Sequence, residues 1–248
     1  MSIIDKKQMT EEDIKLNFIT PAILEKGWQD KITMETKVKF TAGKVNLRGN
    51  LVSREAPKKA DYILYLSKNN PLAVVEAKDN NHGVSFGMQQ AKLYAQMLDV
   101  PFAYSSNGDA FQEYDFITGI EREIGLDDFP SPEELWARYQ NEINNGKGLS
   151  ETERMLIAQP YYTSQNTYPP RYYQQVAVNR TMEAIAKGQQ RILLVMATGT
   201  GKTYTAFQIV YRLLQSGIKQ KILYLADRNN LVDQTISGDF KPLEKVIH

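Results

Sequence analysis

The feature that most constrains this chain is a glycine-rich turn between an apolar run and a helical run. The sequence RILLVMATGTGKTYTA spans residues 191–206. Glycines let backbone N–H groups approach phosphate oxygens without a Cβ in the way, and the following helix N-terminus adds partial positive charge. In such loops the lysine reaches the β/γ phosphates and the Thr hydroxyl binds Mg²⁺. The pattern predicts an ATP- and Mg²⁺-binding loop made of Thr198, Gly199, Thr200, Gly201, Lys202 and Thr203.

The elements around this loop predict an α/β arrangement. Hydrophobic periodicity predicts helices over 171–187 and 202–216 and strands over 191–196 and 221–226. This is a βα unit followed by its next parallel strand. Upstream, the chain is rich in Pro, Tyr, Ser and Thr, which indicates a connection between domains. We therefore expect one domain over 1–150, a linker over 151–170 and a second domain over 171–248.

The loop sequence resembles that of superfamily 2 helicases, in which the Ala-Thr-Gly-Thr-Gly-Lys-Thr form recurs. The general phosphate-loop pattern has Gly where Met196 stands here. Arg171-Tyr172-Tyr173-Gln174 resembles the adenine-recognition motif of that superfamily, which implies a nucleotide contact for Gln174 and Arg171. Residues 222–234 resemble the strand and loop that touch the DNA backbone, with Arg228 as the expected contact.

A second constellation lies upstream, where Asp61 precedes one apolar run and Glu76-Ala77-Lys78 closes another. On a strand, residues two apart point to the same face, so Glu76 and Lys78 are expected to share a site. If the two runs pair, Asp61 converges with Glu76 on one or two divalent ions. Lys78 could then orient or deprotonate water, or stabilise the charge of a phosphorane-like transition state. A surface strand that carries a Glu and a Lys is the alternative.

This pattern resembles the PD-(D/E)xK nucleases. The order of the surrounding features resembles the N-terminal nuclease domain of type I restriction enzyme R subunits. That resemblance implies a site formed by Glu11, Asp61, Glu76, Lys78, Gln90 and Tyr94, with metal bound by Glu11, Asp61 and Glu76. Spacing alone leaves Glu12 open as an alternative to Glu11. A Pro directly before the Asp is missing, since Ala60 stands there.

The combined resemblance implies an α/β fold with a mixed nuclease-like sheet flanked by helices, followed by the beginning of a RecA-like motor lobe. It implies Mg²⁺-dependent cutting of double-stranded DNA, ATP-driven translocation, and separate methyltransferase and specificity subunits as partners. The sequence ends before any Walker B carboxylate pair, so the chain as given is not expected to hydrolyse ATP. Alternatives are a repair helicase–nuclease, another restriction class with both parts, or an inactive nuclease fold that binds DNA or a partner.

Composition narrows the chemistry further. The chain has no Cys and two His, which excludes disulfides and thiolate zinc sites and disfavours a Ser–His–Asp triad. We find neither a secretion signal nor an apolar run of membrane-spanning length, so a cytoplasmic location without membrane contact is expected. Residues 171–248 hold 11 Lys and Arg against 5 Asp and Glu, which suits a phosphate-bearing partner, whereas the first 170 residues are acidic overall.

Local signals predict the first domain's elements. Thr10 is expected to cap a helix over 10–26 that Pro21 kinks or splits. Asn107-Gly108 predicts a hairpin turn, and His82 is interpreted as a solvated loop residue rather than a DNA contact. The remaining predicted elements are strands at Ile32–Phe40, 61–67 and 72–78, a turn at 68–71, and helices at 84–98 and in SPEELWARYQNEI (131–143).

Overall fold

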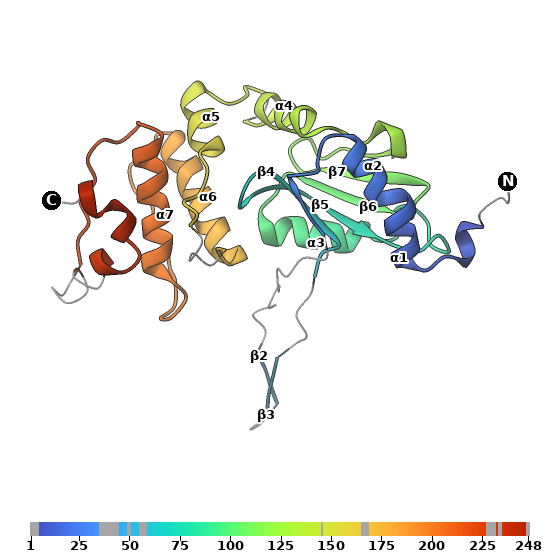
Figure 1. The fold of residues 1–248 in the computed structure, drawn as a ribbon, viewed down its shortest axis with the longest axis horizontal. Helices are drawn as coiled ribbons and strands as arrows, with labels where there is room; N and C mark the ends of the chain where they lie inside the picture. Colours follow the sequence, from blue (N-terminus) through green and yellow to red (C-terminus); the bar gives the residue numbers. More distant parts are fainter. Residues whose placement is uncertain are drawn as a thin grey trace. The chain divides into compact units, whose positions relative to one another are not determined.

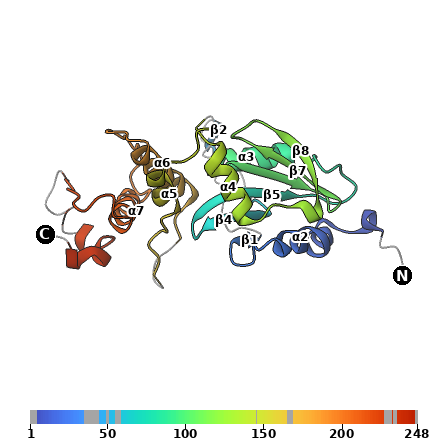
Figure 2. The same cartoon turned by 90° about the horizontal axis from the view of Figure 1, so that it is seen from above.

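The computed structural model of the chain describes residues 5–34, 59–144, 146–164, 169–226, 232 and 235–246, and the backbone of 45–48 and 51–54. The chain forms two compact units, Met1–Gly148 and Leu149–His248. The predicted α/β class is confirmed for the first unit, which contains a mixed six-stranded sheet flanked by helices (Figures 1 and 2). No helix within the described residues is long and apolar enough to cross a membrane.

The sheet of the first unit has the strand order β1-β4-β5-β6-β7-β8. Neighbouring strands are antiparallel except for β5 and β6, which are parallel. The strands are β1 (Ile32–Met34), β4 (Tyr62–Ser67), β5 (Asn70–Ala77), β6 (Phe102–Ser106), β7 (Ala110–Asp115) and β8 (Glu121–Gly125). A separate pair, β2 (Val45–Arg48) and β3 (Leu51–Arg54), is antiparallel. The predicted strand at Ile32–Phe40 begins as expected, and its residues 35–40 lie outside the described part.

A parallel pair needs a crossover connection, and helix α3 (Met88–Leu98) supplies it between β5 and β6. Helix α4 (Pro132–Glu142) lies on the opposite side of the sheet (Figure 1). Its Arg138 reaches down to two buried carboxylates of β7, Glu113 and Asp115. Ser131 caps α4 through a reciprocal pair of hydrogen bonds with Glu134, at the start of the helix predicted over 131–143.

The opening helix forms with Thr10 as its cap, and Asp13 completes the capping box. It does not break at Pro21. The structure instead has α1 (Glu11–Ile14), a π-helical turn η2 (Lys15–Ile19) and α2 (Thr20–Glu25), with Pro21 in the first turn of α2. A wider turn before the proline is a known way to accommodate its missing N–H within a continuous helix.

Two turns of the first unit follow the sequence prediction. Asn69, with φ +66°, makes the turn between β4 and β5, and Gly108, with φ +83°, makes the turn between β6 and β7. The helix predicted over 84–98 begins later, at Met88, because Gly83–Gly87 form turns whose Val84 carbonyl accepts from Ser105. Three short 3-10 helices are η1 (Lys6–Gln8), η3 (Leu126–Asp128) and η4 (Lys241–Val246).

The second unit is built from helices α5 (Glu151–Ala158), α6 (Tyr172–Ala186) and α7 (Lys202–Gln215). The segment expected as a linker at 151–170 is therefore partly folded. Its α5 packs Leu156 and, just beyond it, Tyr161 against α6 and α7. The buried Arg212 of α7 donates to the Leu156 and Ile157 carbonyls at the end of α5. These contacts, between residues distant in sequence, stabilise a helix where the composition predicted a linker.

The strands predicted at 191–196 and 221–226 are not formed in the described chain. Neither segment has regular secondary structure, and the side chains of both alternate in exposure. Leu193 and Val195 are 84% and 88% exposed, whereas Ile192 and Leu194 are each 39% exposed. A β-strand requires hydrogen bonds to a neighbouring strand, and none pairs with either segment among the described residues. The prediction of strands was therefore wrong, although the side chains of both segments alternate in exposure as those of a strand do.

Candidate functional site

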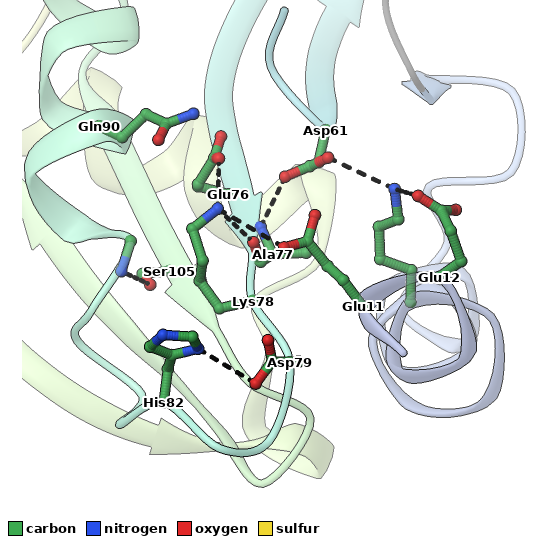
Figure 3. Close-up of polar contacts among 12 residues, drawn as sticks. Glu11, Glu12, Asp61, Glu76, Ala77, Lys78, Asp79, His82, Gln90 and Ser105 are labelled. Atoms are coloured by element: carbon green, nitrogen blue, oxygen red, sulfur yellow. Dashed lines mark hydrogen bonds and ion pairs between the residues drawn. The ribbon is translucent and has the colours of Figure 1, made fainter. Parts of the chain in front are cut away.

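Four charged side chains that the sequence predicted to form a site meet where β4 begins and β5 ends. They are Glu11, Asp61, Glu76 and Lys78. Tyr62 pairs with Val75 in the antiparallel register, so Asp61, one residue before β4, lies beside Glu76. Lys78 follows β5 directly, and its backbone N–H continues the ladder to the Ser106 carbonyl at 2.8 Å. Figure 3 shows the Asp61, Glu76, Lys78 and Glu11 side chains pointing toward one another. The strand register therefore creates this cluster.

Asp61 is held by both of its carboxylate oxygens. Oδ2 accepts from the Ala77 backbone N–H at 2.9 Å, and Oδ1 lies 3.5 Å from the ammonium nitrogen of Lys15. The Asp61 side chain is 17% exposed, so the carboxylate lies at the rim of the cluster rather than in bulk water. Figure 3 shows the Asp61 carboxylate between the Ala77 N–H and the ammonium group beside Glu12.

Glu76 is the most buried carboxylate of the cluster, with 3% of its side chain exposed. Its Oε1 accepts from Lys78 at 2.8 Å, while Oε2 is buried and has no hydrogen-bond partner among the described residues. Burial raises the pKa of Glu76 to about 7, and the nearby Asp61 charge adds to this rise. A buried carboxylate oxygen without a partner is costly, which makes Glu76 a candidate for binding a ligand.

Lys78 is the cationic centre of the cluster. Its Nζ lies 2.8 Å from Glu76 Oε1, 2.8 Å from the Ala77 carbonyl and 3.8 Å from Glu11 Oε2. Burial by itself would lower the pKa of Lys78, but the bond to Glu76 and the surrounding carboxylates outweigh it and raise the pKa above its ordinary value. In this arrangement Lys78 remains an ammonium group.

The structure separates Glu11 from Glu12, which spacing could not. Glu11 faces the cluster: burial raises its pKa, Lys78 acts in the opposite direction, and Asp61 raises it further. Glu12 is turned away, with its side chain 67% exposed, and forms an ion pair with Lys15 one helical turn later. Figure 3 shows the two carboxylates on different sides of the helix.

The predicted pair on the following helix is also brought together. Gln90 Nε2 donates to the Tyr94 hydroxyl at 3.0 Å, as expected for residues four apart on one helical face. Burial raises the pKa of Tyr94, and the Glu76 charge contributes to the rise, which ties this helix electrostatically to the cluster. Gln90 itself is exposed at the edge of the site.

Three residues that support the cluster were not predicted from sequence. Lys15 contacts Asp61 from the first helix. Ser105 lies opposite Glu76 in the parallel register, and its hydroxyl accepts from the Gly87 N–H at 3.1 Å. A Cβ on Gly87 would lie 2.8 Å from Ser105 Oγ and 3.1 Å from Glu76 Cγ, so only glycine fits there without displacing them. The helical spacing of Lys15 after Glu11 was a signal that could have been used.

The donor set is suited to a hard divalent cation, since Mg²⁺ prefers carboxylate oxygens. Within the described residues, no three carboxylates or imidazoles are grouped closely enough to form a metal cage by themselves. The unpartnered Oε2 and the raised pKa of Glu76 nevertheless fit a carboxylate that lacks its cation. The assignment of metal to Glu11, Asp61 and Glu76 stays a prediction.

The loop that follows the cluster places His82 beside it. His82 Nδ1 lies 3.1 Å from Asp79 Oδ1, and its ring packs against Phe86 at 4.0 Å between centroids. Asn107 donates to the His82 carbonyl, which fixes the loop to the turn between β6 and β7. These contacts place His82 in a structured loop and leave its side chain half-buried, and its interpretation as a solvated residue rather than a DNA contact stays a prediction.

In the second unit, the glycine-rich loop precedes α7 as predicted. Gly199 and Gly201 have φ of +77° and +81°, a conformation that L side chains rarely adopt. Helix α7 begins at Lys202, whose ammonium group folds back to the Ala197 carbonyl at 3.3 Å. Thr200 Oγ1 donates to the same carbonyl at 2.6 Å. The loop thus has the backbone shape of an anion-binding turn at a helix N-terminus.

Gln174 connects the start of α6 to this loop. Its Oε1 accepts from the Arg171 N–H at 2.8 Å, and its Nε2 donates to the Thr200 carbonyl at 2.8 Å. Tyr173 reaches the same carbonyl at 3.3 Å, and Arg171 donates to the Tyr173 hydroxyl. Sequence resemblance predicted a nucleotide contact for Gln174 and Arg171. The structure brings Gln174 to the loop directly, whereas Arg171 is connected to the loop through Tyr173. Arg228 lies outside the described residues.

Two family models and several known proteins match this chain. The model "Type I restriction enzyme R protein N terminus (HSDR_N)" matches residues 31–130, and the model "Type III restriction enzyme, res subunit" matches residues 167–247. The type I restriction enzyme EcoAI endonuclease subunit of Escherichia coli is 47% identical over 246 residues, which cover 98% of this chain. The chain is a homologue of type I restriction enzyme R subunits.

Further relatives of the R-subunit family agree with this result. The EcoKI endonuclease subunit of Escherichia coli strain K12 is 34% identical over 72% of this chain and 18% of its own length. A fragment structure of a putative HsdR subunit from Vibrio vulnificus YJ016 is 40% identical with a TM-score of 0.70, and the match covers 84% of this chain and 38% of that one. The chain spans 30% of the EcoAI subunit, so activities of whole R subunits are proposals for it.

Proposed function

We propose that the first unit is a PD-(D/E)xK-type, Mg²⁺-dependent endonuclease that cuts double-stranded DNA. The observation that carries this proposal is the convergence of Asp61, Glu76 and Lys78 at the ends of two paired strands, where Glu76 Oε2 has no hydrogen-bond partner in the described part of the chain. A surface strand bearing a Glu and a Lys would place both groups in water. The burial of Glu76 supports the nuclease reading over that alternative.

Within this proposal, Glu76, Asp61 and Glu11 hold the cation. Bound Mg²⁺ would supply Lewis-acid activation of the phosphodiester and of the attacking water. Lys78 keeps its proton because the surrounding carboxylates raise its pKa. The Lys78 ammonium group would stabilise negative charge that develops on the scissile phosphate and would orient water. Tyr94 and Gln90 border the site from α3.

We further propose that the second unit begins an ATP-driven DNA motor of the superfamily 2 type. Lys202 would hold the β/γ phosphates of ATP, and Thr203 would hold its Mg²⁺. Gln174 and Arg171 would contact the adenine, and the Gln174 bond to Thr200 would link that contact to the phosphate loop. The left-handed glycines and the start of α7 at Lys202 support this assignment.

By kinship with R subunits, the protein would act in the cytoplasm as part of a type I restriction complex, with methyltransferase and specificity subunits supplying sequence recognition. The matches to type I endonuclease subunits favour this assignment over a repair helicase–nuclease. The intact set of Asp61, Glu76 and Lys78 argues against a nuclease fold that only binds DNA or a partner.

Single substitutions in the full restriction complex test both halves of the proposal. Glu76→Ala and Lys78→Ala should abolish DNA cutting while ATP hydrolysis and translocation continue. Lys202→Ala should remove ATP hydrolysis, and with it both translocation and cutting. Glu133→Ala is a matched control, because the Glu133 side chain is 78% exposed on α4. Normal cutting by Glu76→Ala would refute the nuclease assignment and leave only the motor.

A further inference from the structure

Lys15 is a buried cation that belongs to none of the motifs described above. It lies in the π-helical turn η2, and its side chain is only 9% exposed. Burying an ammonium group is unfavourable unless acidic partners compensate for the lost hydration. The contacts of Lys15 must therefore account for its burial.

Its contacts connect the first helix to the nuclease cluster. Lys15 forms an ion pair with Glu12 and lies 3.5 Å from Asp61 Oδ1. Glu12 and Asp61 can be followed in Figure 3, where dashed lines run from both of them to the same ammonium group. Glu12 thus contacts the Lys15 ammonium group from the solvent side, and Asp61 contacts it from the side of the nuclease cluster.

Asp61 has two anchoring contacts, and they are of different kinds. The Ala77 N–H, at 2.9 Å from Oδ2, is fixed by the backbone of β5. One hydrogen bond leaves the carboxylate free to rotate about it, whereas a second contact on Oδ1 removes that freedom. Lys15 provides this second contact, so it helps to fix the direction in which the Asp61 oxygens point.

We propose that Lys15 is a positioning residue for Asp61, and that Glu12 holds Lys15 in place. The inference rests on the proposed nuclease function, because it gives the orientation of Asp61 a purpose in cation binding. It also assigns different tasks to the two adjacent glutamates of the first helix. Glu11 faces the cation site, whereas Glu12 supports the residue that aligns Asp61.

Charge must be controlled in any test of this role. Lys15→Met alone leaves the Glu12 carboxylate without its cationic partner. This uncompensated negative charge would attract a cation to the site and mask a loss of Asp61 alignment. The double variant Glu12→Gln/Lys15→Met removes one charge of each sign, so the net charge beside Asp61 is unchanged. Any remaining effect on cation binding then reports the position of the Asp61 carboxylate.

The experiment measures Mn²⁺ binding by calorimetry and DNA cutting as a function of Mg²⁺ concentration, with the full-length protein in its restriction complex. The double variant should bind Mn²⁺ at the nuclease site about five- to tenfold more weakly and need correspondingly more Mg²⁺ to cut. Lys15→Arg, which keeps charge and reach, should remain within about twofold of wild type. ATP hydrolysis should be unchanged in both variants.

Lys31→Met is the matched control, because Lys31 makes an ion pair of similar length, 3.4 Å to Glu133, outside the cluster. It should bind Mn²⁺ and cut as wild type does. Folding of each variant is followed by far-UV circular dichroism of the purified full-length subunit before the complex is assembled. If the double variant fails to fold, Glu12→Gln/Lys15→Gln keeps polar groups at both positions but is too short to reach Asp61.

Wild-type Mn²⁺ affinity and Mg²⁺ dependence in a folded double variant would overturn the inference. So would a Lys15→Arg variant as impaired as the double variant, or a parallel loss of ATP hydrolysis, since either result indicates a general structural role. These outcomes differ from failure of the proposed function. If the proposed function is wrong, the wild-type protein will not bind Mn²⁺ at this site, and Glu76→Ala will not reduce cutting.

Discussion

The Lys78 ammonium nitrogen lies 2.8 Å from Glu76 Oε1, while Oε2 of the same carboxylate is buried without a hydrogen-bond partner among the described residues. One oxygen is therefore neutralised from within the chain, and the other is the oxygen that the proposed cation would contact. The arrangement costs stability in the absence of that ligand, because a carboxylate is desolvated and only half compensated. A cost of this kind is typical of functional sites and leads to the first prediction.

Glu76→Gln should change how stability depends on pH. Glu76 has a pKa of about 7 in the folded protein against an ordinary value of 4.5. Its contribution to stability is fully present below pH 4.5 and is lost as pH rises through 7, because the unfolded state ionises first. Relative to wild type, Glu76→Gln should gain up to about 3 kcal/mol between pH 4.5 and 8. Denaturant unfolding followed by tryptophan fluorescence, without divalent ions, measures this difference.

Glu133→Gln is the control for that experiment, since its carboxylate is exposed. Its unfolding free energy should stay parallel to that of wild type over the same pH range. A Glu76→Gln curve that also runs parallel to wild type would contradict the proposed burial of charge at Glu76.

Gly87→Ala should impair cutting much more than it impairs folding. An added Cβ would press on Ser105 Oγ and Glu76 Cγ at 2.8 and 3.1 Å, which displaces the carboxylate. Overpacking of this size costs about 1–3 kcal/mol, whereas small displacements at a site can reduce a rate by about 100-fold. Gly83→Ala, in the same loop, is the control because its Cβ would meet nothing within 4 Å. Equal cutting rates for the two variants would show that Gly87 does not set the position of Glu76.

Arg138→Met should destabilise the first unit by about 3 kcal/mol, because it leaves two buried carboxylates without their main partner. Arg138 binds Glu113 through both oxygens at 2.8 and 3.0 Å and Asp115 at 2.9 Å. Burial opposes ionisation of Glu113, but its bonds to Arg138, Tyr104 and Arg122 prevail and lower its pKa. The stability gained from this depressed pKa is present above pH 4.5 and lost as pH falls below it. The deficit of Arg138→Met should therefore shrink under acidic conditions.

Arg122→Met provides the comparison for that network. Arg122 contacts the same Glu113 Oε1 at 2.8 Å, but its side chain is 52% exposed. The expected loss is below about 1 kcal/mol, as for other solvent-screened pairs. Similar losses for the two arginine variants in denaturant unfolding would argue against the importance of burial here.

Gly201→Ala should weaken nucleotide binding through a collision with Gln174. Gly201 has φ +81°, and an added Cβ would overlap with Gln174 Nε2. Gly199→Ala has the same left-handed strain but meets nothing within 4 Å, so it should be milder. The affinity of the full-length protein for a fluorescent ATP analogue measures both effects.

Gln174→Ala makes the collision testable by a double-mutant cycle. In that background the penalty of Gly201→Ala should fall by about 1 kcal/mol or more, because the colliding group is gone. Strict additivity of the two substitutions would mean that the Gln174 contact with Thr200 does not shape the loop.

Local sequence signals determined much of this protein. The Thr10 cap, the Asn69 and Gly108 turns, and the apolar runs of β4 and β5 depend on a few neighbouring residues, so sequence could predict them. The same applies to the glycine loop before α7, whose backbone shape depends on Gly199 and Gly201 themselves.

Only tertiary structure decided which groups meet. The first helix packs with Glu11 facing the cluster and Glu12 facing solvent, which spacing could not predict. Lys15 and Gly87 lie at the site because they contact residues that are distant in sequence. The helix α5 formed where composition indicated a linker, because Arg212 and the α6–α7 core stabilise it. The segments 191–196 and 221–226 have strand-like sequences but lack neighbours among the described residues. Propensity is a property of the segment, whereas a strand or a site requires partners that the rest of the fold must supply.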